Sequence, residues 1–190
     1  MKGEVRRRQI VEVALRLVSE HGVQGATLNR IAREVGMTTA GLYGHFKNRR
    51  EILLAVMDVV FERVQALHRS ASNPNALERL RESSIAHTRA AERFAAAAFE
   101  FVAAPPGEGI REVWGEKTLT LIEELAEIVR EGQAQGTIRK DADCYYVAWM
   151  LVGWGWTKDV SSLMGISSHW MGPRSERMLN EMLEEIRNPE

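Results

Sequence analysis

The stretch Thr27–Lys47 constrains the fold of this chain more than any other. Its apolar residues fall at helical spacing on both sides of one glycine: Leu28, Ile31, Ala32 and Val35 before it, and Leu42, Tyr43 and Phe46 after it. Gly36 lacks a Cβ and so adopts a left-handed turn easily, and Thr38 is a favoured N-cap residue. The pattern predicts two short helices joined by a tight turn, the helix-turn-helix arrangement that inserts its second helix in the DNA major groove. A helical hairpin without that role is the alternative.

The charge of the chain is divided unevenly along its length. Residues 1–50 contain ten lysines and arginines but four glutamates, a net charge of +6. Because the whole chain carries −1, the remainder carries −7. This asymmetry is typical of a nucleic-acid-binding segment joined to a body with another task.

The stretch Thr27–Lys47, with the NRREILLAVMD run after it, closely resembles the tetracycline-repressor (TetR) family of bacterial transcriptional regulators. The residues that carry the resemblance are Thr27, Ile31, Ala32, Gly36, Thr38, Leu42, Tyr43, His45, Phe46, Lys47 and Leu53. The motif covers about the first quarter of the chain. The resemblance implies an all-helical homodimer that binds operator DNA and releases it when a small ligand fills the C-terminal domain.

The predicted DNA-binding set combines this resemblance with the basic N-terminus. The resemblance implies that Thr38, Thr39, Tyr43, His45 and Lys47 contact phosphates or bases, and Tyr43 has a competing role in the core. The sequence departs from the family at Thr39 and Gly44, so we expect base contacts that are sparse, or that shift to thymine methyl groups at Thr39 and Ala40, or that are shared with the N-terminal arm. The three arginines near the start are expected to contact phosphates or the minor groove, unless they form a solvated helix end. The full set is Arg6, Arg7, Arg8, Thr27, Thr38, Thr39, Ala40, Tyr43, His45 and Lys47.

Composition excludes several other classes of protein. The chain has 190 residues, of which 45% are hydrophobic, so it can bury a sizeable core, yet no run of about 18 apolar residues predicts a membrane span. The charged N-terminus lacks a signal core, so we expect a cytoplasmic protein. Cys144 is a single cysteine, and no Cys/His cluster has metal-ligand spacing, so we expect no metal or cofactor. A nucleophile elbow, a phosphate-binding glycine loop and a metal triad are missing, so the chain is not expected to be an enzyme.

The rest of the chain predicts an all-α fold. We expect helices at 4–21, 48–70, 77–91 and 110–134, one in the ERFAAAAFEFVAA stretch that ends before Pro105, and one more that Asp141 caps. The last helix is expected to start at Pro173 or Arg174 and to end at about Arg187. Asn48 and Glu51 form a predicted capping box. The predicted domains are a helix-turn-helix domain, residues 1–48, and a larger helical ligand-binding and dimerisation domain, residues 49–190.

The dimer and the ligand site are predicted from aromatic and apolar residues. The segment Tyr145–Trp156 is apolar on nearly every face, so one side needs a partner chain. The last helix has Met178, Leu179, Met182, Leu183 and Ile186 on one side, and both helices match the family's dimerisation pair. Candidate ligand-binding residues are Phe61, Val64, His68, Phe94, Phe99, Trp114 and Trp149, with Trp154 as a further candidate. Each of them alternatively belongs to the core, and His87 is expected to be a surface or satisfied histidine.

The sequence therefore predicts a repressor that a small hydrophobic or aromatic ligand releases from a palindromic operator. The helix at 48–70 is expected to link the DNA-binding segment to the ligand site. The alternative is a helical DNA-binding or interaction protein without an effector.

Overall fold

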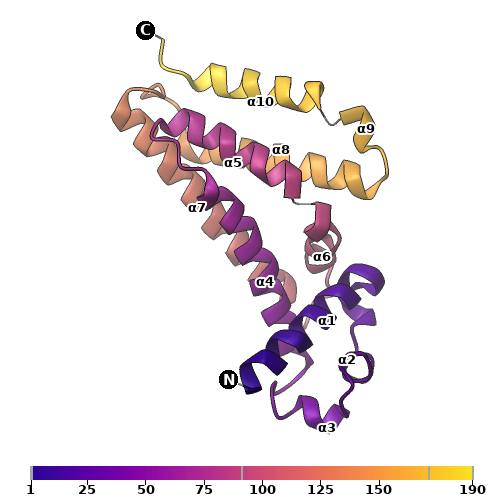
Figure 1. The fold of residues 1–190 in the computed structure, drawn as a ribbon. Helices are drawn as coiled ribbons and strands as arrows, with labels where there is room; N and C mark the ends of the chain where they lie inside the picture. The colour runs from indigo at the N-terminus through magenta and orange to yellow at the C-terminus, as the bar shows by residue number, and fades with distance from the viewer. Residues whose placement is uncertain (1, 91, 171, 190) are drawn as a thin grey trace. The chain divides into compact units, whose positions relative to one another are not determined.

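The computed structural model describes residues 2–90, 92–170 and 172–189. Within these ranges the chain is helical apart from turns and one isolated antiparallel bridge between Ile138 and Arg187, which confirms the predicted all-α class. The helices are, in order (Figure 1), α1 (Lys2–Gly25), α2 (Leu28–Val35), α3 (Thr39–Leu42), α4 (Arg49–Ser70), α5 (Ala76–Ala90), α6 (Glu92–Val102), α7 (Ile110–Gln135), α8 (Cys144–Leu163), α9 (Ser167–Trp170) and α10 (Pro173–Ile186).

Contacts divide the chain into two compact units. Unit 1 comprises Met1–Glu62 and Ala96–Glu116, and unit 2 comprises Arg63–Ala95 and Lys117–Glu190. Helices α4, α6 and α7 each contribute residues to both units. The domain boundary that the sequence predicts after residue 48 falls inside unit 1, and it stays a prediction about where the DNA-binding function ends.

Unit 1 begins with the helix-turn-helix, and local signals explain its shape. Gly22 interrupts the backbone of α1 with φ 73° and ψ 170°, where the sequence predicted the helix to stop. Thr27 caps α2 and Thr38 caps α3, because the hydroxyl of each accepts a hydrogen bond from a backbone N–H in the first turn. Gly36 ends α2 in the left-handed conformation, with φ 70° and ψ 37°, which confirms the predicted glycine turn.

The start of α4 is held by a reciprocal pair of hydrogen bonds. The N–H of Glu51 donates to Asn48 Oδ1 at 2.9 Å, and Glu51 Oε2 accepts from the N–H of Lys47 at 2.7 Å. The predicted capping box is therefore present, with its return bond one residue earlier than in the usual arrangement. These two bonds also hold the last residues of the short turn that joins α3 to α4.

Unit 2 is a set of helices around a leucine- and valine-rich core. Helix α5 lies beside α8, and α10 packs against α5 (Figure 1). The side chains buried between them include Leu77, Leu80, Val147, Leu151, Leu179 and Leu183. Gly132 in α7 is needed for close packing, since a Cβ there would lie 2.5 Å from Ile138 Cδ1.

One predicted cap is wrong. The N-cap of α8 is Asp143, whose Oδ1 accepts from the N–H groups of Tyr145 at 2.9 Å and Tyr146 at 3.0 Å. Asp141, the predicted cap, lies in the preceding turn with its carboxylate 3.5 Å from Arg139 Nε. Two aspartates two residues apart offer the same cap signal in the sequence, and only the path of the backbone decides between them.

Helix α8 is apolar on two opposite faces, as predicted. Val147, Leu151 and Trp154 are buried within unit 2, whereas Tyr146 is 63% exposed and Trp149 is 48% exposed. The exposed residues recur at spacings of three and four and form what we call the α8 stripe, Tyr146, Trp149, Gly153 and Trp156.

Helix α10 differs from the expectation for its apolar side. Leu179, Leu183 and Ile186 are buried within the protomer, so they are not available to a partner chain. Met178 is exposed and Met182 is half-buried, so these two apolar side chains of α10 stay accessible.

Candidate nucleic-acid interface and internal cavity

The short helix α3 and the turn after it expose three of the predicted contact residues. Ala40 and Lys47 are exposed, and Tyr43 is 55% exposed. The sequence left Tyr43 open between core and contact, and the structure gives the core role to Leu42 and Phe46 instead. The hydroxyl of an exposed tyrosine and the ammonium of an exposed lysine are suited to phosphate oxygens.

The three threonines of the predicted set also support the local fold. Thr27 and Thr38 accept the capping bonds from Arg30 N at 3.3 Å and from Gly41 N at 3.0 Å. A hydroxyl that accepts one bond can still donate its proton, so capping does not remove these two from a phosphate contact. Thr39 Oγ1 donates to Asn29 Oδ1 at 2.9 Å, so its hydroxyl ties α3 to α2.

The three N-terminal arginines of α1 separate into two kinds. Arg6 and Arg8 are exposed. Arg7 is directed into unit 1, where it donates to the His45 carbonyl, pairs with Glu51 Oε1 at 3.2 Å and lies 3.9 Å over the ring of Phe46. The structure thus gives Arg7 a role in positioning the turn after α3, which is different from the predicted contact with DNA.

The Glu51 carboxylate accepts hydrogen bonds from two donors around this turn. The hydrogen bond from the Lys47 N–H, and then that from Arg7, hold the pKa of the Glu51 carboxyl below its usual range. The carboxylate is therefore ionised, and it keeps both donors in place. His45, half-buried in the same turn, contributes its backbone carbonyl to the arrangement.

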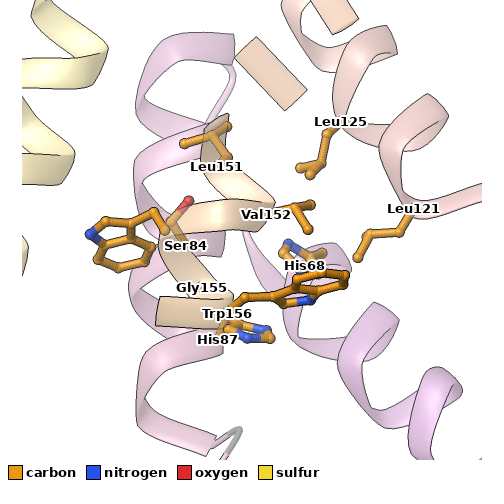
Figure 2. Close-up of a pocket in the computed structure, with 10 residues that line it drawn as sticks. His68, Ser84, His87, Leu121, Leu125, Leu151, Val152, Gly155 and Trp156 are labelled. Atoms are coloured by element: carbon orange, nitrogen blue, oxygen red, sulfur yellow. The ribbon is translucent and has the colours of Figure 1, made fainter. Parts of the chain in front are cut away.

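Unit 2 contains a small cavity that is mostly apolar. Its volume is about 40 Å³, which is room for about three water molecules. The walls are formed by His68 from α4, Ser84 and His87 from α5, Leu121 and Leu125 from α7, and Leu151, Val152, Trp154, Gly155 and Trp156 from α8. Figure 2 shows the two imidazoles and the Trp156 indole at one end of the cavity and Leu151 at the other.

The two histidines are the polar feature of the cavity. The rings of His68 and His87 are stacked with their centroids 5.7 Å apart and an interplanar angle of 28°. Burial, and then repulsion by His87, lowers the pKa of His68 from its usual 6.5 to about 4, so His68 is neutral at pH 7. His87 Nε2 lies 3.6 Å from Asp159 Oδ2, and the buried Nδ1 atoms of both histidines have no hydrogen-bond partner among the described residues.

The predicted ligand-binding residues do not gather in one place. His68 lines the cavity, and so does the further candidate Trp154. Phe61 and Trp114 pack edge to face in unit 1, with centroids 6.3 Å apart. Trp149 is half-exposed on the α8 stripe.

The other three predicted residues also lie away from the cavity wall. Phe94 carries the guanidinium of Arg63 over its ring at 5.1 Å, and Val64 and Phe99 are half-buried outside the wall. The prediction that His87 is a surface or satisfied histidine is wrong: it lines the cavity with 14% of its side chain exposed, and its Nδ1 has no hydrogen-bond partner among the described residues. Nothing in its own surroundings in the sequence indicates its approach to His68 and Asp159.

Neither a membrane-spanning helix nor a metal-binding cluster is present among the described residues. No helix there has the length and apolarity to cross a membrane, and no group of three or more His, Cys, Asp or Glu side chains is placed to hold a metal ion.

Residues 10–56 match the profile of the family described as bacterial regulatory proteins, tetR family. The class D tetracycline repressor protein of Escherichia coli is 32% identical over 92 residues, which are 46% of this chain and 40% of that protein. The chain spans about a quarter to two fifths of the length of the first curated relatives that it matches.

Solved structures of the same fold cover the whole chain. A TetR-family transcriptional regulator from Cytophaga hutchinsonii superposes with a TM-score of 0.86 at 16% identity, over 100% of this chain and 98% of that one. AibR, solved in complex with isovaleryl coenzyme A and operator DNA, has a TM-score of 0.67 at 25% identity, over 97% of this chain and 100% of its own. The fold is therefore an N-terminal helix-turn-helix followed by a larger helical region, as predicted.

The different surroundings of the N-terminal arginines lead to a first prediction. Arg7→Ala removes the ion pair with Glu51 and the contact with Phe46, so we expect it to lower the free energy of unfolding by about 1 kcal/mol. Arg6→Ala is the matched control and should leave stability unchanged, because Arg6 is exposed. Urea unfolding followed by circular dichroism measures both, and equal stability of the two variants would contradict the positioning role of Arg7.

The neutral, buried His68 leads to a second prediction. Its pKa is lower in the folded than in the unfolded chain, so its contribution to stability is complete above about pH 6.5 and is lost as the pH falls towards 4. Between pH 7 and pH 5 the wild type should lose about 2 kcal/mol more than His68→Gln, which cannot take up the proton. Urea unfolding at the two pH values measures the difference. An equal loss in both proteins would show that His68 titrates normally.

Proposed function

Because this chain belongs to the TetR family, we propose that it is a transcriptional repressor that binds operator DNA as a homodimer and releases it when a small ligand occupies unit 2. The observation that carries the proposal is the helix-turn-helix of residues 27–47, with its caps and glycine turn formed, inside the segment that matches the family. The helix α3 then enters the major groove.

The exposed residues of unit 1 define the proposed DNA-binding surface. Lys47 and Tyr43 contact phosphates, together with Arg6 and Arg8 at the start of α1, and Ala40 faces the base edges. Thr27, Thr38, Thr39 and His45 belong to the same surface through the family resemblance. Arg7 acts indirectly by holding the turn that carries Lys47.

The proposed dimer interface is the α8 stripe with Met178 and Met182 of α10. The rings of Tyr146, Trp149 and Trp156 are partly exposed to water in an isolated protomer. This exposure costs about 25 cal/mol per Å² of apolar surface. A two-fold axis that pairs α8 and α10 with their copies buries both stripes in a four-helix bundle.

The proposed effector site is the cavity lined by His68 and His87. AibR, the relative solved with both isovaleryl coenzyme A and operator DNA, supports the coupling of a ligand to DNA binding. Helix α4 carries the signal, because its residues up to Glu62 belong to unit 1 and His68, near its end, lines the cavity. A preference of the ligand for the released state of about 1–3 kcal/mol lowers DNA affinity roughly 5- to 150-fold.

The DNA-binding surface is tested through the salt dependence of binding. The operator is first selected from a random duplex pool, and a pseudo-palindrome is expected. Each phosphate contact contributes about 0.9 to the slope of log K against log salt, so Lys47→Ala should reduce the slope by about two units for the two copies in a dimer. Lys140→Ala, in the exposed turn after α7, is the matched control and should bind as the wild type does. An unchanged slope for Lys47→Ala would remove Lys47 from the surface.

The dimer is tested by placing a charge in the α8 stripe. Trp149→Glu should raise the dimer dissociation constant by about 100-fold or more, because a carboxylate would be buried without a partner. Leu119→Glu changes a residue of α7 that is also exposed and apolar but lies outside the stripe, so this variant should stay dimeric. Sedimentation velocity at micromolar concentration separates the cases, and a monomeric wild type would contradict the interface.

A further inference from the structure

The corner between α1 and α2 is held by an arginine that lies outside the helix-turn-helix, Arg49 at the start of α4. Arg49 Nε donates to the Ala26 carbonyl at 3.0 Å, and its Nη2 donates to the Val23 carbonyl. The last carbonyls of a helix have no partner within the helix and need one elsewhere. Arg49 therefore caps the end of α1 from another helix, and it does so next to Thr27, the residue that caps the start of α2.

The remaining nitrogen of the Arg49 guanidinium faces Glu108, in the turn between α6 and α7. Arg49 Nη1 lies 3.0 Å from Glu108 Oε1 and 2.9 Å from Glu108 Oε2, so it donates to the carboxylate. A guanidinium is planar and its N–H donors have fixed directions, so the position of the carboxylate sets the direction of the donors that reach Val23 and Ala26. Glu108 thus orients the group that caps α1.

The backbone of the α6–α7 turn holds Glu108 in place. Gly107 and Gly109, on either side of Glu108, have φ angles of 108° and 65°, in the left-handed region that favours glycine. Arg50 Nε donates to the Glu108 carbonyl. Glu108 is therefore bound at its main chain as well as at its carboxylate.

A second carboxylate, that of Glu100 in α6, binds the same corner. Glu100 Oε2 accepts from the Val23 N–H at 3.1 Å. The approach is close, since a Cβ at Gly22 would lie 2.6 Å from Glu100 Oε2. All of these residues belong to unit 1. The corner before α2 therefore takes its position from α4, α6 and the α6–α7 turn as well as from α1.

The position of this corner affects the proposed DNA-binding surface, because α2 packs against both α1 and α3. The corner sets where α2 begins, while the start of α1 carries Arg6 and Arg8 of that surface. Base and phosphate contacts form together only when the second helix and the flanking cations fit the duplex at the same time. A rotation at the corner would misalign α3 with the arginines of α1.

We propose that Glu108 and Arg49 are positioning residues for operator binding: their ion pair sets the angle between α1 and α2, so the α6–α7 turn supports DNA binding without touching DNA. Arg49 is half-buried and directed at the two carbonyls, so it acts through the corner and not through a phosphate. The inference rests on the proposed function, because operator binding is the activity that the pair supports.

The first test removes the charge of Glu108 and keeps the size of its side chain. Glu108→Gln should lower operator affinity about tenfold, because the paired guanidinium loses its bidentate acceptor. The slope of log K against log salt should not change, because no phosphate contact is lost. Loss of a carboxylate from a DNA-binding unit otherwise strengthens binding by reducing repulsion of the phosphates, so weaker binding identifies a positioning role.

Glu112→Gln is the matched control. Glu112 is exposed in the first turn of α7, belongs to the same unit and makes no ion pair within the part of the chain that the structure describes. Its loss should not weaken binding. Affinities are measured well below each melting temperature, with the active fraction determined by stoichiometric titration, so reduced stability alone does not change them. An affinity of Glu108→Gln equal to or above that of Glu112→Gln would overturn the proposal.

The second test changes the shape of the Arg49 side chain and keeps its charge. The single ammonium group of Arg49→Lys cannot reach both carbonyls and Glu108 together, so operator affinity should again fall about tenfold. A lysine would preserve a phosphate contact, so wild-type affinity in this variant would overturn the proposal. The double variant should bind no more weakly than Arg49→Lys alone, because both changes break one contact. Additive losses would also overturn the proposal, and if Glu108→Gln fails to fold, Arg49→Lys decides the matter.

The same measurements distinguish the failure of this inference from that of the proposed function. A wild-type protein that selects no operator from a random duplex pool would refute the proposed function, and the inference with it. If the wild type and Glu112→Gln bind a selected operator and Glu108→Gln binds it equally well, the inference is refuted while the DNA-binding function stands.

Discussion

The carboxylate of Glu51 accepts hydrogen bonds from the Lys47 N–H and from Arg7, and these two bonds hold the turn between α3 and α4. A helix of four residues cannot hold its own geometry in water, because helix nucleation is unfavourable and short helices are marginal. Burial of Leu42 fixes one side of α3, and burial of Phe46 anchors the turn after it. The bonds to Glu51 hold the end of that turn, at Lys47. The proposed contact surface for DNA is thus supported by residues that do not themselves belong to it.

Most of unit 1 was predictable because its signals are local. A threonine cap, a left-handed glycine and a helical stripe act within a few residues, so Thr38, Gly36 and the face of α2 could be read from the sequence. The role of Arg7 could not, since its partners lie 38 and 44 residues further along the chain. In the sequence it is one of three consecutive arginines with the same apparent role.

The cavity was less predictable for the same physical reason. His68, His87 and Asp159 come from α4, α5 and α8, and their approach depends on how three helices pack. The aromatic residues that the sequence suggested as pocket walls, such as Phe61 and Trp114, stabilise the core by packing on each other. The size and apolarity of a side chain do not distinguish a core residue from one in a pocket wall.

Unit 1 also includes the segment Ala96–Glu116, and this affects how the chain can be recombined. Glu100 accepts a hydrogen bond from the Val23 N–H at 3.1 Å, and Glu108 pairs with Arg49 at 2.9 Å, while Arg49 also donates to the Ala26 carbonyl at 3.0 Å. A chimera that exchanges only about the first fifty or sixty residues for those of another regulator would remove the native donors to Glu100 and Glu108. Unit 1 is discontinuous in the sequence. An exchange of the helix-turn-helix for that of another regulator therefore has to include the matching residues of α6 and of the α6–α7 turn.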